Sequence, residues 1–74
     1  MIKIGALCRR MHGSQNLCQV VSLYDRRDID FECPESVAIV GMVKFILLSG
    51  EHMGRVFSQK RSDFNYRWEV INDA

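Results

Sequence analysis

Hydrophobic and polar side chains alternate along most of this chain. The alternation is clear in residues 2–9, 17–24, 28–33 and 64–71, and residues 55–60 also favour a strand. Successive side chains of a β-strand point to opposite faces, so the pattern predicts short strands with one buried face. The intervening segments are polar or contain glycine and are predicted to be loops or turns, at residues 11–16, 25–27, 49–54 and 61–63.

The clearest of these predicted strands, residues 64–71, concentrates aromatic side chains on one face. Phe64, Tyr66, Trp68 and Val70 alternate there with polar residues. Burial of large aromatic side chains is a main source of folding free energy in a small domain. Trp68 is therefore predicted to be a core residue, in phase with its neighbours on that face.

The predicted strand at residues 28–33 has an acidic face and an apolar face. The two faces consist of Asp28, Asp30 and Glu32, and of Ile29, Phe31 and Cys33. We interpret the acids as a solvated face rather than as a metal or acid–base site. Pro34 has no backbone N–H to donate to a neighbouring strand and is predicted to stop the pairing.

Residues 36–48 are compatible with either a strand or a helix. A helix would begin near Pro34 and end before Gly50, both favoured at those positions. Such a helix would be apolar on nearly every side, and a domain of 74 residues cannot easily bury it. The β-branched residues Val37, Ile39, Val40 and Val43 favour a strand, with Gly41 marking a bulge or bend. We therefore expect a strand.

The order of strands and turns predicts an all-β fold in a single domain, residues 1–74. Five or six short strands must curl or stack to hide one face, and a small antiparallel barrel, SH3-like or OB-like, achieves this. The alternative is an α+β fold with one helix near residues 36–48. Fold class by itself carries no function.

The composition of the chain bears on its expected cellular compartment and oligomeric state. Hydrophobic residues are 47% of the chain, but the longest apolar run, residues 37–48, is interrupted by Lys44 and too short to cross a bilayer. The N-terminus lacks the apolar region of a signal peptide, so a cytoplasmic protein is expected, without membrane contact. The apolar content exceeds what a small barrel needs, which predicts a homodimer or a larger homo-oligomer.

The candidate chemical groups favour a protein without metal, cofactor or catalytic activity. Cys8, Cys18 and Cys33 lie within strand patterns without a Cys-x2-Cys spacing, which indicates reduced structural thiols rather than zinc ligands, even with His12 nearby. The two histidines lie in predicted loops beside Ser14 and Glu51, in no catalytic pattern, and no glycine-rich phosphate loop is present.

Charge is distributed unevenly although the net charge is only +1. Residues 1–24 carry +3, residues 25–35 carry −3 and residues 36–74 carry +1. The candidate partner-binding or nucleic-acid-binding residues are Arg9, Arg10, Lys60, Arg61 and Arg67. A surface of mixed sign suits an oriented protein partner, which predicts a small accessory or inhibitory protein, such as one encoded by a phage. The alternative is a nucleic-acid-binding barrel that uses the basic N-terminal strand and C-terminal hairpin, with phosphate contacts beside aromatic side chains.

Overall fold

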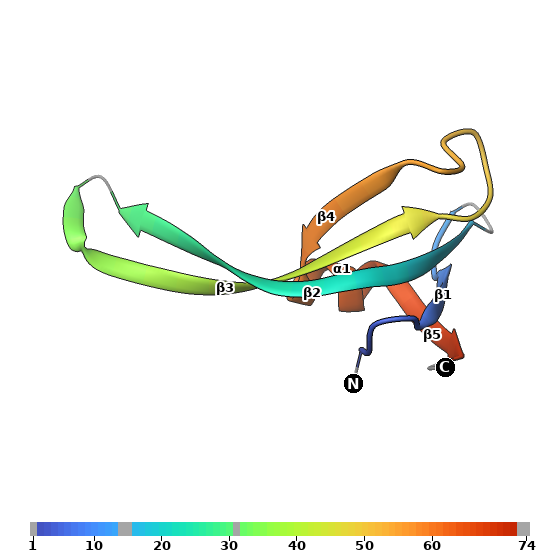
Figure 1. The fold of residues 1–74 in the computed structure, drawn as a ribbon, viewed down its shortest axis with the longest axis horizontal. Helices are drawn as coiled ribbons and strands as arrows, with labels where there is room; N and C mark the ends of the chain where they lie inside the picture. The colour runs from blue at the N-terminus through green and yellow to red at the C-terminus, as the bar shows by residue number, and fades with distance from the viewer. Residues whose placement is uncertain (1, 14–15, 31, 73–74) are drawn as a thin grey trace.

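The computed structural model describes residues 2–13, 16–30 and 32–72 and contains five strands and one helix in that part of the chain. The elements are β1 (Leu7–Arg10), β2 (Leu17–Asp30), β3 (Cys33–Leu47), β4 (Val56–Lys60), α1 (Arg61–Arg67) and β5 (Trp68–Asn72) (Figure 1). With seven residues, α1 is too short to cross a membrane, and the described residues include no longer helix.

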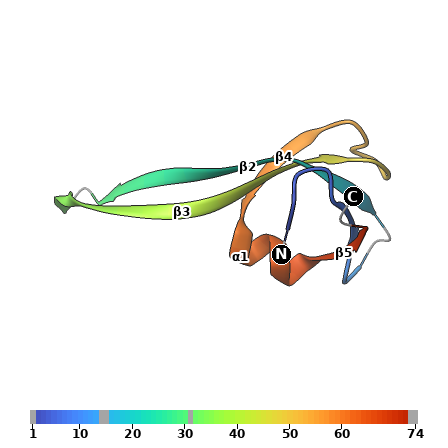
Figure 2. The same ribbon diagram turned by 60° about the horizontal axis from the view of Figure 1, so that its bottom comes forward.

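All five strands belong to one antiparallel sheet in the order β4-β3-β2-β1-β5. The first strand lies between β2 and the last strand, so the sheet curls, and α1 connects the end of β4 to the start of β5 (Figure 2). No pairing between described residues joins the edge strands β4 and β5. The all-β prediction is therefore confirmed at the level of one antiparallel sheet with a short helix, while the open sheet does not confirm a closed barrel.

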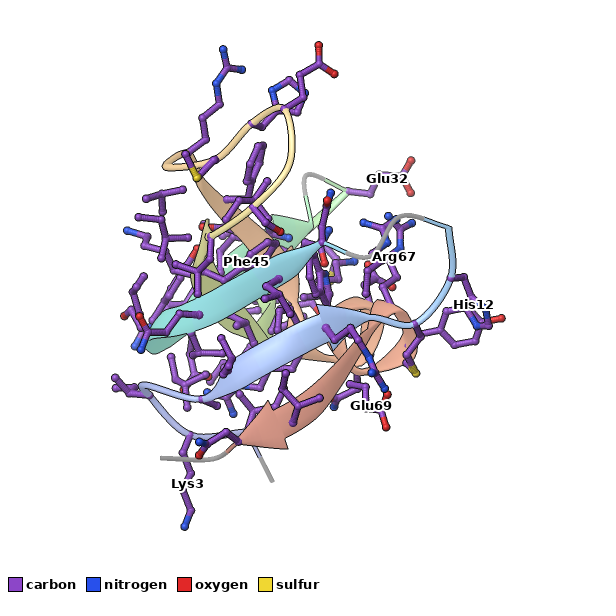
Figure 3. All side chains as sticks on the ribbon, turned by 90° about the vertical axis from the view of Figure 1, so that its right-hand side faces the viewer. Lys3, His12, Glu32, Phe45, Arg67 and Glu69 are labelled. Atoms are coloured by element: carbon purple, nitrogen blue, oxygen red, sulfur yellow. The ribbon has the colours of Figure 1, made fainter. Side chains whose placement is uncertain are left out.

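The core lies inside the curve of the sheet. Its buried side chains come from every element except β4 and from Ala6 just before β1, namely Ala6, Cys8, Cys18, Val20, Val43, Phe45, Leu47, Phe64 and Trp68. The ring of Phe45 is central, with centroids 5.2 Å from Phe64, 5.5 Å from Trp68 and 6.1 Å from Phe57. In the view from the end of the molecule, Phe45 lies within the body while Lys3, His12 and Glu69 project outward (Figure 3).

Residues 36–48 fall almost entirely within β3, so the predicted strand is confirmed and the helical alternative is wrong. Several boundaries were predicted incorrectly. The expected turn at residues 25–27 is part of the continuous strand β2, and the strand expected at residues 2–9 begins only at Leu7. β3 runs through Pro34, but residues 34–36 have no partner on β2, because the pairs pass from Ile29↔Val37 to Asp30↔Cys33. The pairing is therefore interrupted at Pro34, as expected, and its missing N–H costs no ladder hydrogen bond. Phe31 and Ser14 lie outside the described residues.

The predicted strand at residues 64–71 is wrong in its first half, and so is the predicted turn at residues 61–63. Both segments form α1, and β5 begins only at Trp68. Phe64 in the helix and Trp68 at the first position of β5 lie about one helical turn apart, and both side chains enter the core. Tyr66 points away and is 77% exposed, whereas Trp68 is 5% exposed. The core position of Trp68 is therefore confirmed, but its shared face with Tyr66 is not.

The β2–β3 hairpin extends far beyond the body of the protein (Figure 1). β1 pairs with β2 only up to Gln19, and β4 pairs with β3 only from Met42 onward. Residues 25–41 therefore form a two-stranded projection, here called the arm. The arm gives the molecule its elongated dimensions of 42 × 24 × 20 Å.

Candidate functional site

The arm is a hairpin without a third strand on either side. Its pairs run from Asp25↔Gly41 to Ile29↔Val37, and no other described strand pairs with them. An isolated two-stranded hairpin is only marginally stable in water. The outer edges of both strands therefore remain available for pairing with another chain.

One face of the arm carries an exposed apolar stripe, which consists of Ile29, Val37 and Ile39. Ile29 and Val37 are directly opposed, and Ile39 is two residues further along the same strand. The three side chains are 58%, 50% and 68% exposed, respectively. Alternation along β3 places the stripe on the face that continues into the core at Val43. The core-facing side of the sheet thus extends into solvent without a cover.

The charges of the molecule separate into an acidic arm and a basic body. Residues 25–41 contain five acids and two arginines, a formal charge of −3, and the remainder of the chain carries +4. One of the two arginines, Arg26, is held by Asp28 on the same strand, with Nε 2.9 Å from Oδ1. The acidic segment noted in the sequence therefore becomes one end of an elongated molecule.

The five basic residues predicted from the sequence lie in two groups at opposite ends of α1. Arg9, Arg10 and Arg67 lie near the start of β5, where the Met11 N–H donates to the backbone oxygen of Arg67. Arg9 forms an ion pair with Glu69, with Nη2 2.8 Å from Oε2. The guanidinium of Arg10 lies over the ring of Trp68, 5.6 Å from its centroid.

The second basic group, Lys60 and Arg61, lies at the root of the arm. The Arg61 guanidinium is 4.0 Å from a carboxylate oxygen of Asp25. Its side chain also crosses Gly41, since a Cβ atom there would lie 3.1 Å from the Arg61 Cδ atom. Gly41 thus allows Arg61 to pack closely against the point where the arm leaves the body.

A pocket of about 250 Å³ opens on the core side of the sheet between its edge strands. It is lined by Arg10, Asn16, Phe45, Leu47, His52, Phe57, Gln59 and Trp68. Two of these residues, Gln59 and Trp68, each carry a buried polar atom without a hydrogen-bond partner among the described residues, Gln59 Oε1 and Trp68 Nε1. Both atoms are closed off from solvent, and a buried polar group without a partner costs about 1–3 kcal/mol.

Sequence reasoning did not identify this pocket. Gln59 is a polar residue in a strand pattern, and Trp68 was expected to be an ordinary core residue. Of the pocket residues, only Arg10 had been predicted from the sequence to bind a partner. A larger hollow of about 470 Å³, lined by Ile2, Leu23, Arg61, Asn65 and Val70, contains no buried polar atom of this kind within the described chain.

The cysteines and histidines do not form a catalytic or metal-binding arrangement. Cys8 and Cys18 are opposed across β1 and β2 and fully buried, and burial raises the pKa of both thiols. A raised pKa lowers the thiolate fraction and the reactivity of a cysteine. His12 and His52 are exposed in loops. Within the described ranges, no group of three or more side chains of metal-ligating type comes together.

Comparisons of the chain with models of protein families, with curated proteins and with solved structures found no match. Functional inference for this protein therefore depends on its own surfaces.

Proposed function

We propose that this protein is a non-enzymatic protein-interaction module and that the arm is its main binding element. The observation that carries this proposal is the exposed stripe of Ile29, Val37 and Ile39 on a hairpin with two free edges. Burial of an aliphatic side chain is worth about 1.5–3 kcal/mol, so covering the stripe would contribute several kcal/mol to binding. An exposed apolar patch rimmed by charged residues is typical of an interaction surface.

The partner surface that fits the arm is apolar at its centre and basic around it. The arm carries a formal charge of −3, which favours positively charged surroundings and speeds their encounter. The free edges of β2 and β3 allow the partner to contribute a strand, in which case main-chain hydrogen bonds supply affinity and the stripe supplies specificity.

The proposal also includes the barrel type, the cellular setting and the oligomeric state. The adjacency of β1 and β5 curls the sheet toward closure, which supports a small barrel of SH3-like type. A chain of 74 residues with one binding projection suits a small accessory or inhibitory protein of the cytoplasm, such as one encoded by a phage. A homo-oligomer would cover part of the exposed apolar surface.

The experiment that tests the arm compares two variants with the same added charge. Ile39→Asp places a carboxylate in the stripe, whereas Ala38→Asp places one on the opposite face of the same strand. We expect quantitative affinity capture to recover a protein with the wild type and with Ala38→Asp, but not with Ile39→Asp. The recovered protein is then purified and titrated by calorimetry, where Ile39→Asp should bind at least tenfold more weakly. Equal binding by both variants contradicts the proposal.

Nucleic-acid binding is the second candidate function, and the contact between Arg10 and Trp68 favours it. Against it, Arg9 is paired with Glu69, and the Trp68 ring is covered by Arg10 on one side and stacked with Phe64. Binding to phosphates must weaken steeply with salt, because counterions are released.

For the second candidate, we expect negligible binding to random oligonucleotides at physiological ionic strength. Micromolar, salt-sensitive binding that is abolished by Lys60→Glu with Arg61→Glu would establish it instead of the protein function. The double variant is expected to remain folded, because both side chains are exposed.

A further inference from the structure

The stripe of the arm and the larger hollow, of about 470 Å³, belong to one face of the sheet. Leu23 lines the hollow and is directly opposed to the core residue Val43. From this pair, every second residue along β2 and β3 lies on the same face, as far as Ile29 and Val37 in the stripe. A continuous face therefore runs from the hollow in the body to the outer part of the arm.

The charge of the arm changes sign along its length. Its outer end, residues 28–35, contains four acids and no base. Its inner end, defined as residues 25–27 together with the adjacent Arg61, contains three arginines and one acid. Acidic and basic groups are therefore separated along a single projection.

Two cations of the inner end lie on the face of the stripe. Arg27 is directly opposed to Ile39 across the hairpin, so their side chains share that face. The Arg61 side chain crosses Gly41, two residues further along β3, and also lines the hollow. The apolar part of the hollow's lining consists of Ile2, Leu23 and Val70. The hollow thus has an aliphatic centre beside a guanidinium, which complements the aliphatic and acidic side chains of the arm.

The arm cannot reach the hollow of its own chain. It points away from the body (Figure 1), and Ile29 lies six residues from Leu23 along one continuous strand, or about 20 Å. The stripe and the hollow can therefore meet only between two copies of the chain.

A surface that carries both halves of a complementary contact suits a two-fold pair of identical chains. In such a pair, any contact made by one copy is repeated by the other. When two arms lie face to face in opposite directions, the outer end of each meets the inner end of the other, and acids face arginines twice. Parallel arms would instead place the four acids of one copy against those of the other, and such like-charge contacts are unfavourable.

We propose that the partner of the arm is a second copy of this chain, bound as a two-fold pair with antiparallel arms. Ile29 and Val37 of each copy pack into the hollow of the other, and the acids of the outer end lie beside Arg61. This inference rests on the proposed function, since it names the partner of the same surface.

The first test uses the wild-type chain and NMR. In a mixture of ¹³C-labelled and unlabelled protein, isotope-filtered NOEs arise only between different copies. We expect these NOEs to join the methyl groups of Ile29 and Val37 to those of Leu23 and Val70. Filtered NOEs that join Ile29 of one copy to Ile29 of the other would indicate parallel arms and contradict the inference.

The second test exchanges charges between two variants and measures self-association by sedimentation. The inner-end variant carries Arg27→Glu with Arg61→Glu, and the outer-end variant carries Glu32→Lys with Glu35→Lys. All four side chains are exposed, so both variants should fold, which dispersed amide spectra verify. Each variant alone should self-associate at least tenfold more weakly than the wild type, because opposite charges no longer meet at either end of the pair.

Mixing the two variants is the decisive measurement. They should bind each other at least tenfold more tightly than either binds itself, because the new lysines then meet the new glutamates and the remaining acids meet the remaining arginines. Arg55→Glu with Arg67→Glu makes the same change of net charge as the inner-end variant. Both residues are exposed and lie outside the lining of the hollow, and Arg67 lies at the opposite end of α1 from Arg61. This control should self-associate as the wild type does.

A lack of any gain on mixing would refute the antiparallel pair, and a wild-type monomer at millimolar concentration would refute self-association. The failure of this inference is distinguishable from failure of the proposed function. A wild-type monomer whose capture of another protein is lost in Ile39→Asp refutes only the second copy as partner. A wild-type monomer whose capture is unaffected by Ile39→Asp refutes the proposed function of the arm as well.

Discussion

Trp68→Ala is the substitution that most directly tests the core. The Trp68 ring lies 5.5 Å from Phe45 and 6.0 Å from Phe64, between centroids, and Arg10 packs over it. The residue joins α1 to β5, since its backbone N–H donates to the Phe64 carbonyl at the end of the helix. Truncation would therefore leave a cavity where α1, β3 and β5 meet.

The expected cost is a large part of the total stability. Replacing a buried Trp by Ala destabilises a protein by about 3–5 kcal/mol. A chain of 74 residues has a total unfolding free energy of about 4–11 kcal/mol at the usual 0.05–0.15 kcal/mol per residue. Tyr66→Ala, only two residues away, provides the matched control. Tyr66 is 77% exposed, so its removal should change the unfolding free energy by less than about 0.5 kcal/mol.

Urea unfolding followed by far-ultraviolet circular dichroism measures both variants, because Trp68→Ala removes the only tryptophan fluorophore. We expect Trp68→Ala to be largely unfolded or to have a urea midpoint far below that of the wild type. The midpoint of Tyr66→Ala should be close to the wild-type value. Equal losses in the two variants would show that both side chains share one buried strand face and would refute the helix α1. A stable Trp68→Ala would refute the core assignment itself.

Four further predictions concern the thiols, metal content and assembly. Iodoacetamide at neutral pH should modify Cys33 and spare Cys8 and Cys18 until the protein unfolds; equal labelling of all three would contradict their burial. Because burial raises the pKa of Cys8 and Cys18 in the folded state, the unfolding free energy should fall as pH rises above the ordinary thiol value of about 9. Replacing both by Ala should flatten that decline. Protein purified without added zinc should contain well under one equivalent, and stoichiometric zinc whose chelation unfolds the protein would overturn this. Sedimentation at micromolar concentration should give a mass of at least twice the 8.6 kDa of one chain. The Ile39→Asp variant should have a lower sedimentation mass. A wild-type protein that sediments as a monomer would exclude self-association.

The strands that contribute to the core were predictable because each has one buried face. β4 was also expected, at residues 55–60, and lies at Val56–Lys60, although none of its side chains is buried. β3 was expected from its β-branched residues and from the impossibility of burying an apolar helix in so small a domain. Burial on one face fixes both the existence and the register of such strands.

The arm was not predictable because its strands are exposed on both faces. Asp25, Arg26 and Arg27 have the composition of a turn, yet they pair with Gly41, Val40 and Ile39 in continuous strands. In a hairpin without a covering layer, polar residues are accommodated on either face, so the alternation that marks strand limits is lost. At Pro34 the pairing is interrupted, since residues 34–36 have no partner on β2.

The helix α1 was missed because residues 64–71 satisfy two periodicities at once. Phe64, Tyr66, Trp68 and Val70 have the spacing of two that marks a strand, and Phe64 and Trp68 also have the spacing of four that marks a helix face. Whether these residues form a strand or a helix depends on tertiary structure. The chain must pass from β4 at one edge of the sheet to the opposite edge beside β1 within a few residues. The pocket depends on that passage and on side chains from separate strands, so the sequence alone could not reveal it.

The proposed binding surface of the arm arises where strand pairing is incomplete. β2 and β3 contain 14 and 15 residues, whereas β1, β4 and β5 contain four or five. The β2–β3 hairpin is therefore much longer than the strands that pair with it. None of the buried side chains of the described chain comes from residues 25–41, which means that the arm adds exposed aliphatic surface without adding to the core. This exposed surface does not stabilise an isolated domain, and a partner that supplies a strand or an apolar surface would cover it. The proposed contact with another protein would therefore account for the length of the central hairpin.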